Sequence, residues 1–235
     1  MNRKLKAGVL GLLVVSTAAG LGLAAGVFRL NHPDAVRYPI WNIDVSRHQG
    51  RVDWDAVARD PRLGFAYVKA TEGVTWQDPM FLQNWSGAQR AHLRVGAYHF
   101  LTFCSPAQEQ AAHFLAVVPR DPHALPPAVD LEFGGNCRRV PAKAEARQEL
   151  ETWLRLVEAA LGRRPVVYVT AEAYQEFLQD DDTGYELWIR DIWTSPRLQR
   201  SWSYWQFANR GRLDGVGGFV DLNVFNGSRE EWNRL

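Results

Sequence analysis

The sequence lacks the features of a nucleic-acid-binding, a nucleotide-binding and a metal site. The formal net charge is only +1 over 235 residues, so nothing in the composition points to a nucleic-acid partner. No glycine-rich loop follows the first predicted strand, at residues 41–48, which argues against a nucleotide-binding sheet. The six histidines are scattered and no cysteine and histidine spacing suits zinc, so we expect neither a metal nor a cofactor.

Charged side chains are missing from residues 7–28, and Arg3, Lys4 and Lys6 precede this run. The run exceeds the about 20 apolar residues that span a bilayer, and the basic residues ahead of it favour export of the rest of the chain. A cleaved signal peptide is the alternative, although its apolar region would normally be shorter. We expect residues 1–37 to be a membrane anchor or signal peptide plus a linker, and residues 38–235 to form a domain outside the cytoplasm.

Cysteine is also scarce, with Cys104 and Cys137 as the two examples. In an exported protein such a pair can form a disulfide, which is our expectation. In the chain-entropy model, closing a loop of this size stabilises a fold by roughly 3–4 kcal/mol. Two free buried thiols are the alternative.

Predicted strands and helices alternate along the exported part. Five strands are each followed by a helix, and three more strands come after them with loops too short for full helices. Their ranges are 41–48, 65–69, 94–101, 128–133, 165–170, 186–192, 201–208 and 218–225. This order predicts an α/β fold, a modified TIM-like barrel of five β/α units followed by three β-strands in a single domain. An open doubly wound sheet is the alternative.

Residues 128–133 carry two carboxylates on one face of an apolar strand. Asp130 and Glu132 alternate with Val129, Leu131 and Phe133, so the two acids share a face. Buried carboxylates are costly unless they are paired or used. Two at this spacing can flank a bond that needs an acid on one side and a negative charge on the other. A salt-bridged pair at a strand end is the alternative.

Polar and aromatic side chains also occupy the ends of most other predicted strands, where barrels and open sheets place their chemistry. They are Asp44, Lys69, Glu72, Tyr98, His99, Tyr168, Trp188, Trp205, Gln206, Asp221 and Asn223. Each has a structural explanation when taken singly. Lys69 could pair with Glu72, His99 could be a hydrogen-bonded core histidine, and the two tryptophans could fill the core. Their joint occurrence indicates a functional site.

Five segments, in this order, carry a family resemblance. They read IDVSRHQG at 43–50, FAYVKATEG at 65–73, GAYHF at 96–100, AVDLEF at 128–133, and WQF followed by VDLNVF between 205 and 225. They resemble glycoside hydrolase family 25, the Chalaropsis-type lysozymes or N-acetylmuramidases, over about residues 40–226. The resemblance implies a flattened β/α barrel. It also implies hydrolysis of the β-1,4 bond between N-acetylmuramic acid and N-acetylglucosamine in peptidoglycan.

The resemblance also implies roles for matching residues. Glu132 matches the proposed general acid, and neighbouring acids are expected to raise its pKa. Asp130, Asp44 and Asp221 would stabilise positive charge on the sugar ring and orient the substrate. We prefer participation of the substrate's acetamido group, supported by Asp130, over direct attack by water. The expected lining of the glycan groove is Lys69, Tyr98, His99, Tyr168, Trp188, Trp205 and Gln206.

One segment departs from the family pattern. The sixth predicted strand reads LWIRDI, where the family usually has a small residue and then an aromatic after LWI. Arg190 and Asp191 could pair there and reshape one wall of the groove.

The two ends of the chain suggest a biological setting. Few residues come after Gly227, so we expect no cell-wall-binding repeat. We expect a monomer on the periplasmic face of the inner membrane, or a secreted enzyme if the N-terminal segment is cleaved. Its expected partners are peptidoglycan glycan strands and, through that segment, the membrane. The alternatives are a non-catalytic peptidoglycan-binding barrel and a hydrolase of another amino-sugar polymer such as chitin.

Overall fold

The computed structural model describes residues 16–18, 20–23, 25–26, 31–135, 137–180 and 184–234. The predicted anchor at residues 7–28 lies mostly outside these ranges. Within them, no helix is both long and apolar enough to cross a bilayer.

Eight strands form a closed ring. They are β1 (Trp41–Val45), β2 (Leu63–Glu72), β4 (Arg94–Phe100), β5 (Ala128–Leu131), β6 (Val166–Thr170), β7 (Glu186–Arg190), β8 (Tyr204–Gly211) and β9 (Val220–Phe225). From β1 to β8 each strand is parallel to the next one in the ring, and β9 runs antiparallel to both β8 and β1. A short β3 (Trp76–Gln77) pairs with the end of β2. The predicted single-domain α/β barrel is confirmed, and closure through β1 excludes the open sheet.

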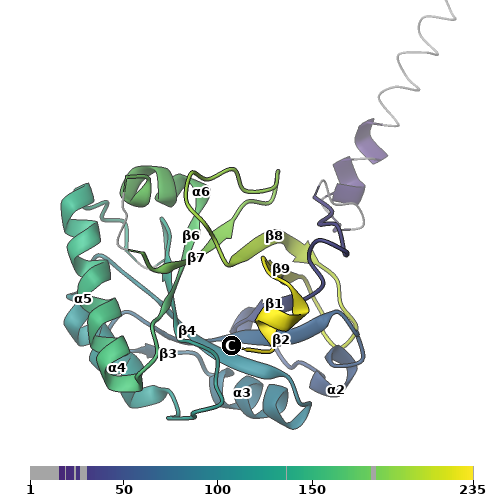
Figure 1. Cartoon of the computed structure of the whole chain (residues 1–235), viewed down its shortest axis with the longest axis horizontal. Helices are drawn as coiled ribbons and strands as arrows, with labels where there is room; N and C mark the ends of the chain where they lie inside the picture. The colour runs from purple at the N-terminus through teal and green to yellow at the C-terminus, as the bar shows by residue number, and fades with distance from the viewer. Residues whose placement is uncertain are drawn as a thin grey trace, which may run out of the picture.

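Most of the helices lie around the ring and follow its earlier strands, whereas the last helix follows the last strand, β9 (Figure 1). They are α2 (Trp54–Val57), α3 (Phe81–Arg90), α4 (Ala107–Val117), α5 (Lys143–Leu161), α6 (Ala171–Ala173) and α7 (Arg229–Trp232), with a 3-10 turn η1 (Arg47–Gln49) and a π-helical turn η2 (Tyr174–Leu178). Helix α5 buries an apolar stripe that includes Leu150, Trp153 and Val157. It ends where Gly162 takes a φ of 66°, a left-handed conformation that favours glycine. No helix separates β7, β8 and β9, since residues 191–203 and 212–219 are loops.

Strand alternation divides the buried side chains into two groups. One group packs between the ring and the helices, and the other fills the ring itself. Inside the ring, Tyr67 contacts Trp188 with ring centroids 4.9 Å apart, and Trp188 contacts Tyr168 at 5.1 Å. Phe65 and Tyr204 are buried in the same group. These aromatic rings close the interior below the carboxyl ends of the strands, so a cavity can form only above them.

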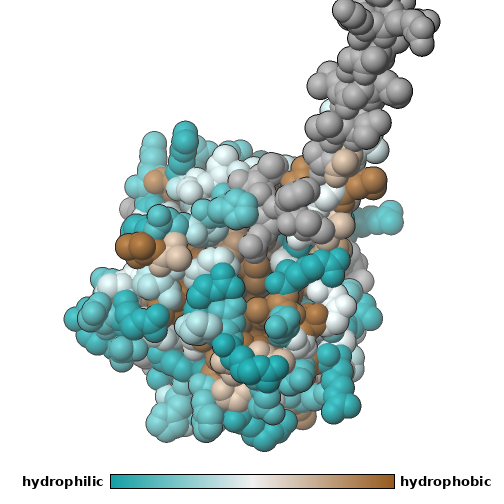
Figure 2. All heavy atoms as spheres, turned by 90° about the vertical axis from the view of Figure 1, so that its right-hand side faces the viewer, coloured by the Kyte–Doolittle hydropathy of each residue, from teal (hydrophilic) through white to brown (hydrophobic). Residues whose placement is uncertain are grey.

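A disulfide joins Cys104 and Cys137, with their Cα atoms 5.7 Å apart. The two residues come after the neighbouring strands β4 and β5. The disulfide prediction is therefore confirmed, and the alternative of two free thiols is wrong. Figure 2 shows one face of the molecule, on which hydrophilic side chains predominate and hydrophobic ones are exposed in small groups.

Candidate active site

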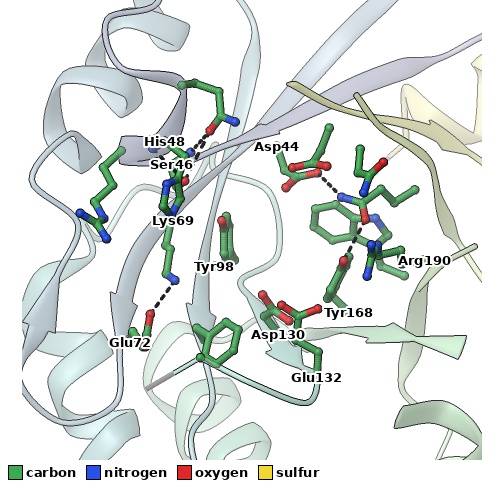
Figure 3. Close-up of a pocket in the computed structure, with 18 residues that line it drawn as sticks. Asp44, Ser46, His48, Lys69, Glu72, Tyr98, Asp130, Glu132, Tyr168 and Arg190 are labelled. Atoms are coloured by element: carbon green, nitrogen blue, oxygen red, sulfur yellow. Dashed lines mark hydrogen bonds and ion pairs between the residues drawn. The ribbon is translucent and has the colours of Figure 1, made fainter. Parts of the chain in front are cut away.

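A cavity of about 560 Å³ opens at the carboxyl ends of the strands. The side chains predicted from the sequence that line it are Asp44, Lys69, Tyr98, Asp130, Glu132, Tyr168, Trp188, Gln206 and Asp221. In Figure 3, Asp130 and Glu132 lie together on one side of the cavity and Asp44 lies across from them. The parallel strands bring these groups together because their carboxyl ends meet at one end of the ring.

The register of the strands explains how the acids face one another. Asp44 on β1 lies opposite Asp221 on β9. Asp130 on β5 lies opposite Tyr168 on β6. Strand β5 ends at Leu131, so Glu132 stands one residue beyond the strand and is half-buried at the rim. The two acids of the D-x-E segment therefore lie at different depths.

Asp44 is held by two side-chain amides that donate to the same carboxylate oxygen. Asn223 Nδ2 lies 2.8 Å and Gln206 Nε2 lies 3.1 Å from Asp44 Oδ2. Each amide is oriented in turn by an aromatic donor. Trp188 Nε1 donates to Asn223 Oδ1 at 2.7 Å, and the Tyr168 hydroxyl donates to Gln206 Oε1 at 2.8 Å. This network fixes both amides with their NH2 groups toward the carboxylate.

Burial sets the protonation of the Asp44 carboxyl. It raises the pKa from 3.8 to about 6, although the hydrogen bonds from Asn223 and Gln206 lower it. The Tyr168 hydroxyl stays protonated at neutral pH because burial and the Asp130 carboxyl raise its pKa well above 10. It can therefore act as a permanent donor to Gln206.

The other three carboxyls also bind protons more tightly than they would in water. Burial raises the pKa of Asp130 well above 3.8, and the neighbouring Glu132 raises it further. Burial and Asp44 do the same for the pKa of Asp221. Burial also raises the pKa of Glu132, whereas the positive charges of Arg190 and Lys69 lower it. The sequence predicted the direction for Glu132 but indicated neighbouring acids as the main cause, and desolvation is the larger one.

A lysine, Lys69, also lines the cavity. Lys69 Nζ forms an ion pair of 2.8 Å with Glu72 Oε2, which confirms the pairing considered from the sequence. The ammonium also lies 4.7 Å from the centre of the Phe100 ring and 5.1 Å from that of Trp76. Lys69 is thus fixed in place while it still lines the cavity.

A family model described as glycosyl hydrolases family 25 matches residues 43–216. The chain belongs to this family. The Escherichia coli O157:H7 protein YegX, described as uncharacterized, is 39% identical over 83% of this chain and 72% of its own length. Lysozyme M1 of Streptomyces globisporus is 31% identical over 91% of this chain and 77% of its own. The solved structure of a family 25 glycosyl hydrolase from Bacillus anthracis is 37% identical, with a TM-score of 0.82 over 88% of this chain and 97% of that one.

Two residues predicted to line the groove of this family 25 protein do not do so. His99 is fully buried on the outer side of β4, where it contacts Thr71 Oγ1 at 2.7 Å and Gln110 Oε1 at 3.1 Å and stacks on Trp153. Burial lowers its pKa to about 3, so it is neutral at pH 7. Trp205 is buried outside the ring among Tyr38, Trp202 and Phe207, and it donates to the backbone oxygen of Asp191 at 2.8 Å. The reason is alternation, since Tyr98 and Gln206 are adjacent in sequence to these residues and already face inward.

The segment that departs from the family 25 pattern does not form the expected ion pair. The Asp191 carboxylate instead accepts hydrogen bonds from the backbone NH groups of Trp193 and Thr194, both at 2.9 Å, and closes a turn. Arg190 lines the cavity and points into it beside Tyr168 (Figure 3). The expectation that Arg190 pairs with Asp191 is therefore wrong, and Arg190 instead forms part of the cavity wall.

Sequence reasoning did not assign several other residues to the cavity. They are Ser46, Arg47, His48, Gln49, Phe100, Gly135 and Asn209. Most lie on loops or at strand ends, where no sequence periodicity indicates which way a side chain points. The run from Ser46 to Gln49 had one signal, because it comes directly after a predicted strand and belongs to a family segment. Among the described residues, no group of three or more histidine, cysteine or acidic side chains could hold a metal ion.

Proposed function

We propose that this family 25 protein is a peptidoglycan muramidase, which hydrolyses the β-1,4 bond between N-acetylmuramic acid and N-acetylglucosamine. The observation that carries the proposal is the convergence of Asp44, Asp130, Glu132 and Asp221 in one cavity of a family 25 barrel. A relative at 31% identity is named a lysozyme. None of the four carboxyls is missing, which disfavours a binding module without activity.

Glu132 serves as the general acid in this proposal. Its raised pKa favours the protonated form, and its place at the rim lets it reach a glycosidic oxygen that enters from solvent. The proton moves from the Glu132 carboxyl to that oxygen as the bond to the anomeric carbon breaks. The leaving N-acetylglucosamine then departs as a neutral alcohol, and the remaining carboxylate can later accept a proton from water.

Asp130 supports the substrate's own acetamido group. The acetamido oxygen attacks the anomeric carbon and closes a five-membered ring, and its N–H needs an acceptor as positive charge develops. Asp130 Oδ1 is buried and has no hydrogen-bond partner among the described residues, so it can accept a hydrogen bond from the acetamido N–H. Asp44 and Asp221 then stabilise the positive charge on the sugar ring.

Glu132→Gln is the substitution that tests this assignment. It keeps the size of the side chain and removes the proton that the leaving group needs, so we expect turnover to fall by about 10²–10⁴-fold. Glu176→Gln is a matched control, because Glu176 is exposed on η2 outside the cavity. Release of reducing ends from peptidoglycan measures both variants. Unchanged turnover in Glu132→Gln would remove Glu132 from the role of acid.

We also propose that the enzyme works outside the cytoplasm. The Cys104–Cys137 disulfide suits an oxidising compartment, and residues 7–28 lack charge as an export segment would. Intact mass spectrometry of the protein recovered from cells tests the form of export. The full-length mass is expected for an anchor, and loss of the N-terminal segment would mean a cleaved signal peptide. The monomeric state stays a prediction.

A further inference from the structure

Arg190 stands at the edge of the acid cluster on a rigid piece of backbone. It is the last residue of β7, paired in register with Thr170 on β6 and Gln206 on β8. The next residue, Asp191, is fixed as well, because its carbonyl oxygen accepts hydrogen bonds from Trp205 Nε1 and from Asn31 Nδ2. The position of the Arg190 backbone is therefore set before any substrate arrives.

The Arg190 guanidinium has no partner of its own among the described residues, where it makes no hydrogen bond or ion pair. The other cations of the cavity are engaged: Lys69 pairs with Glu72, and Arg47 lies over the Trp76 ring at 5.6 Å. Arg190 is half-buried and lies on the opposite side of the cavity from Lys69 (Figure 3). A guanidinium has five N–H donors in a planar fork that matches a carboxylate. This wall therefore offers an anion-binding group to an incoming ligand.

An anionic group that binds Arg190 must belong to a part of the ligand that lies close to the reacting sugar. Gln206, the strand neighbour of Arg190, donates to the Asp44 carboxylate, so Arg190 lies one strand away from a proposed charge-stabilising group. In a muramidase the sugar at that point is N-acetylmuramic acid, which carries a lactyl ether on its ring. The lactyl carboxyl is an uncharged amide when a stem peptide is attached, and it is a free carboxylate after the peptide has been removed.

We propose that Arg190 binds the free lactyl carboxylate of N-acetylmuramic acid, and that the enzyme therefore prefers glycan strands without stem peptides. This inference rests on the proposed muramidase function. The charge of Arg190 also offsets the four acids, which would otherwise repel an anionic sugar. The same charge lowers the pKa of Asp44, Glu132 and Asp221, in agreement with its place beside them.

The test compares two soluble tetrasaccharides of alternating N-acetylglucosamine and N-acetylmuramic acid, one with stem peptides and one with free lactyl groups. Wild type is compared with Arg190→Ala, which restores the small residue usual in the family, and with Arg190→Lys, which keeps the charge but loses the fork. Arg197→Ala, at an exposed position outside the cavity, is the matched control. The readout is the ratio of kcat/KM for the two tetrasaccharides. A substitution that alters the four cavity carboxyls changes both kcat/KM values alike, so that effect cancels in the ratio.

We expect wild type and Arg197→Ala to favour the peptide-free tetrasaccharide by about tenfold, as for a charge-assisted bidentate contact. Arg190→Ala should bring the ratio close to one, mainly through a higher KM for the peptide-free form, and Arg190→Lys should give an intermediate ratio. A ratio that is the same in wild type and Arg190→Ala would overturn the inference. A preference for the peptide-bearing form that is lost in Arg190→Ala would also overturn it, since Arg190 would then contact the peptide.

Calorimetric binding separates this inference from the function on which it rests. Both tetrasaccharides are titrated into Glu132→Gln and into Glu132→Gln with Arg190→Ala, so that no turnover interferes. About tenfold tighter binding of the peptide-free form that requires Arg190 would support the inference even if wild type cleaved neither tetrasaccharide. Equal affinities in the two variants would overturn it even if wild type cleaved both.

Discussion

Asp44→Asn removes a buried ionisable group without removing its hydrogen bonds. Gln206 Nε2 and Asn223 Nδ2 both donate to the one oxygen Asp44 Oδ2. The side-chain oxygen of an asparagine at this position can accept both bonds, and the two side chains have nearly the same size. The substitution therefore isolates the effect of the charge on stability and on turnover.

The size of the stability effect can be worked out from the pKa of Asp44. Burial raises it from 3.8 to about 6, so between these pH values the folded protein keeps a proton that the unfolded chain has lost. The free energy of unfolding therefore falls as the pH rises through this window. At about 1.4 kcal/mol per pH unit, the fall from this group amounts to about 3 kcal/mol. Asparagine has no such loss, so Asp44→Asn should be more stable than wild type at pH 7 by up to about 3 kcal/mol, and nearly equal to it at pH 4.

Urea unfolding followed by tryptophan fluorescence at pH 4 and pH 7 measures this difference. Turnover on peptidoglycan is measured at the same pH values, and we expect a loss of about 10²-fold or more because the charge that faces the sugar ring is gone. Asp214→Asn, at an exposed position outside the cavity, is the control for the chemical change itself. A variant that is destabilised equally at both pH values would refute the reasoning, since the carboxylate would then carry no cost of burial.

Three further variants test other parts of the structure. Replacing both Cys104 and Cys137 with serine should lower the free energy of unfolding by roughly 3–4 kcal/mol in the chain-entropy model, measured by thermal unfolding against the disulfide-bonded wild type; an equally stable variant would contradict this. His99→Gln should cost about 1–3 kcal/mol of stability and leave KM unchanged, and a raised KM in a fully stable variant would return His99 to the groove. Asn223→Ala removes a hydrogen bond that lowers the pKa of Asp44, so the acid limb of the kcat/KM profile should move to higher pH; a limb that stays in place would contradict the hydrogen-bond network.

The barrel and its acids could be predicted because they follow local patterns. The alternation of strand and helix segments indicated a parallel sheet, and Asp130 and Glu132 share a face by strand periodicity. The same periodicity held information that the prediction did not use. Tyr98 and His99 are adjacent on β4, so only one of them can face the cavity, and the same is true of Trp205 and Gln206 on β8.

Other features depend on contacts between distant parts of the chain. The two amides on Asp44 come from β8 and β9, more than 160 positions away in sequence, and their orientation is set by aromatic donors on still other strands. Arg190 stood out as a departure from the family pattern, but the sequence suggested that Asp191 would neutralise it. The turn that occupies Asp191 involves backbone groups at residues 193 and 194, which no side-chain pattern marks.

The most direct measurement identifies which sugar carries the new reducing end. The purified protein is incubated with peptidoglycan, the released fragments are reduced with borohydride, and their ends are read by mass spectrometry. Muramidase action predicts fragments that end in reduced N-acetylmuramic acid, and their loss in Glu132→Gln. Fragments that end in reduced N-acetylglucosamine, or no fragments from a folded protein that binds the glycan, would contradict the account.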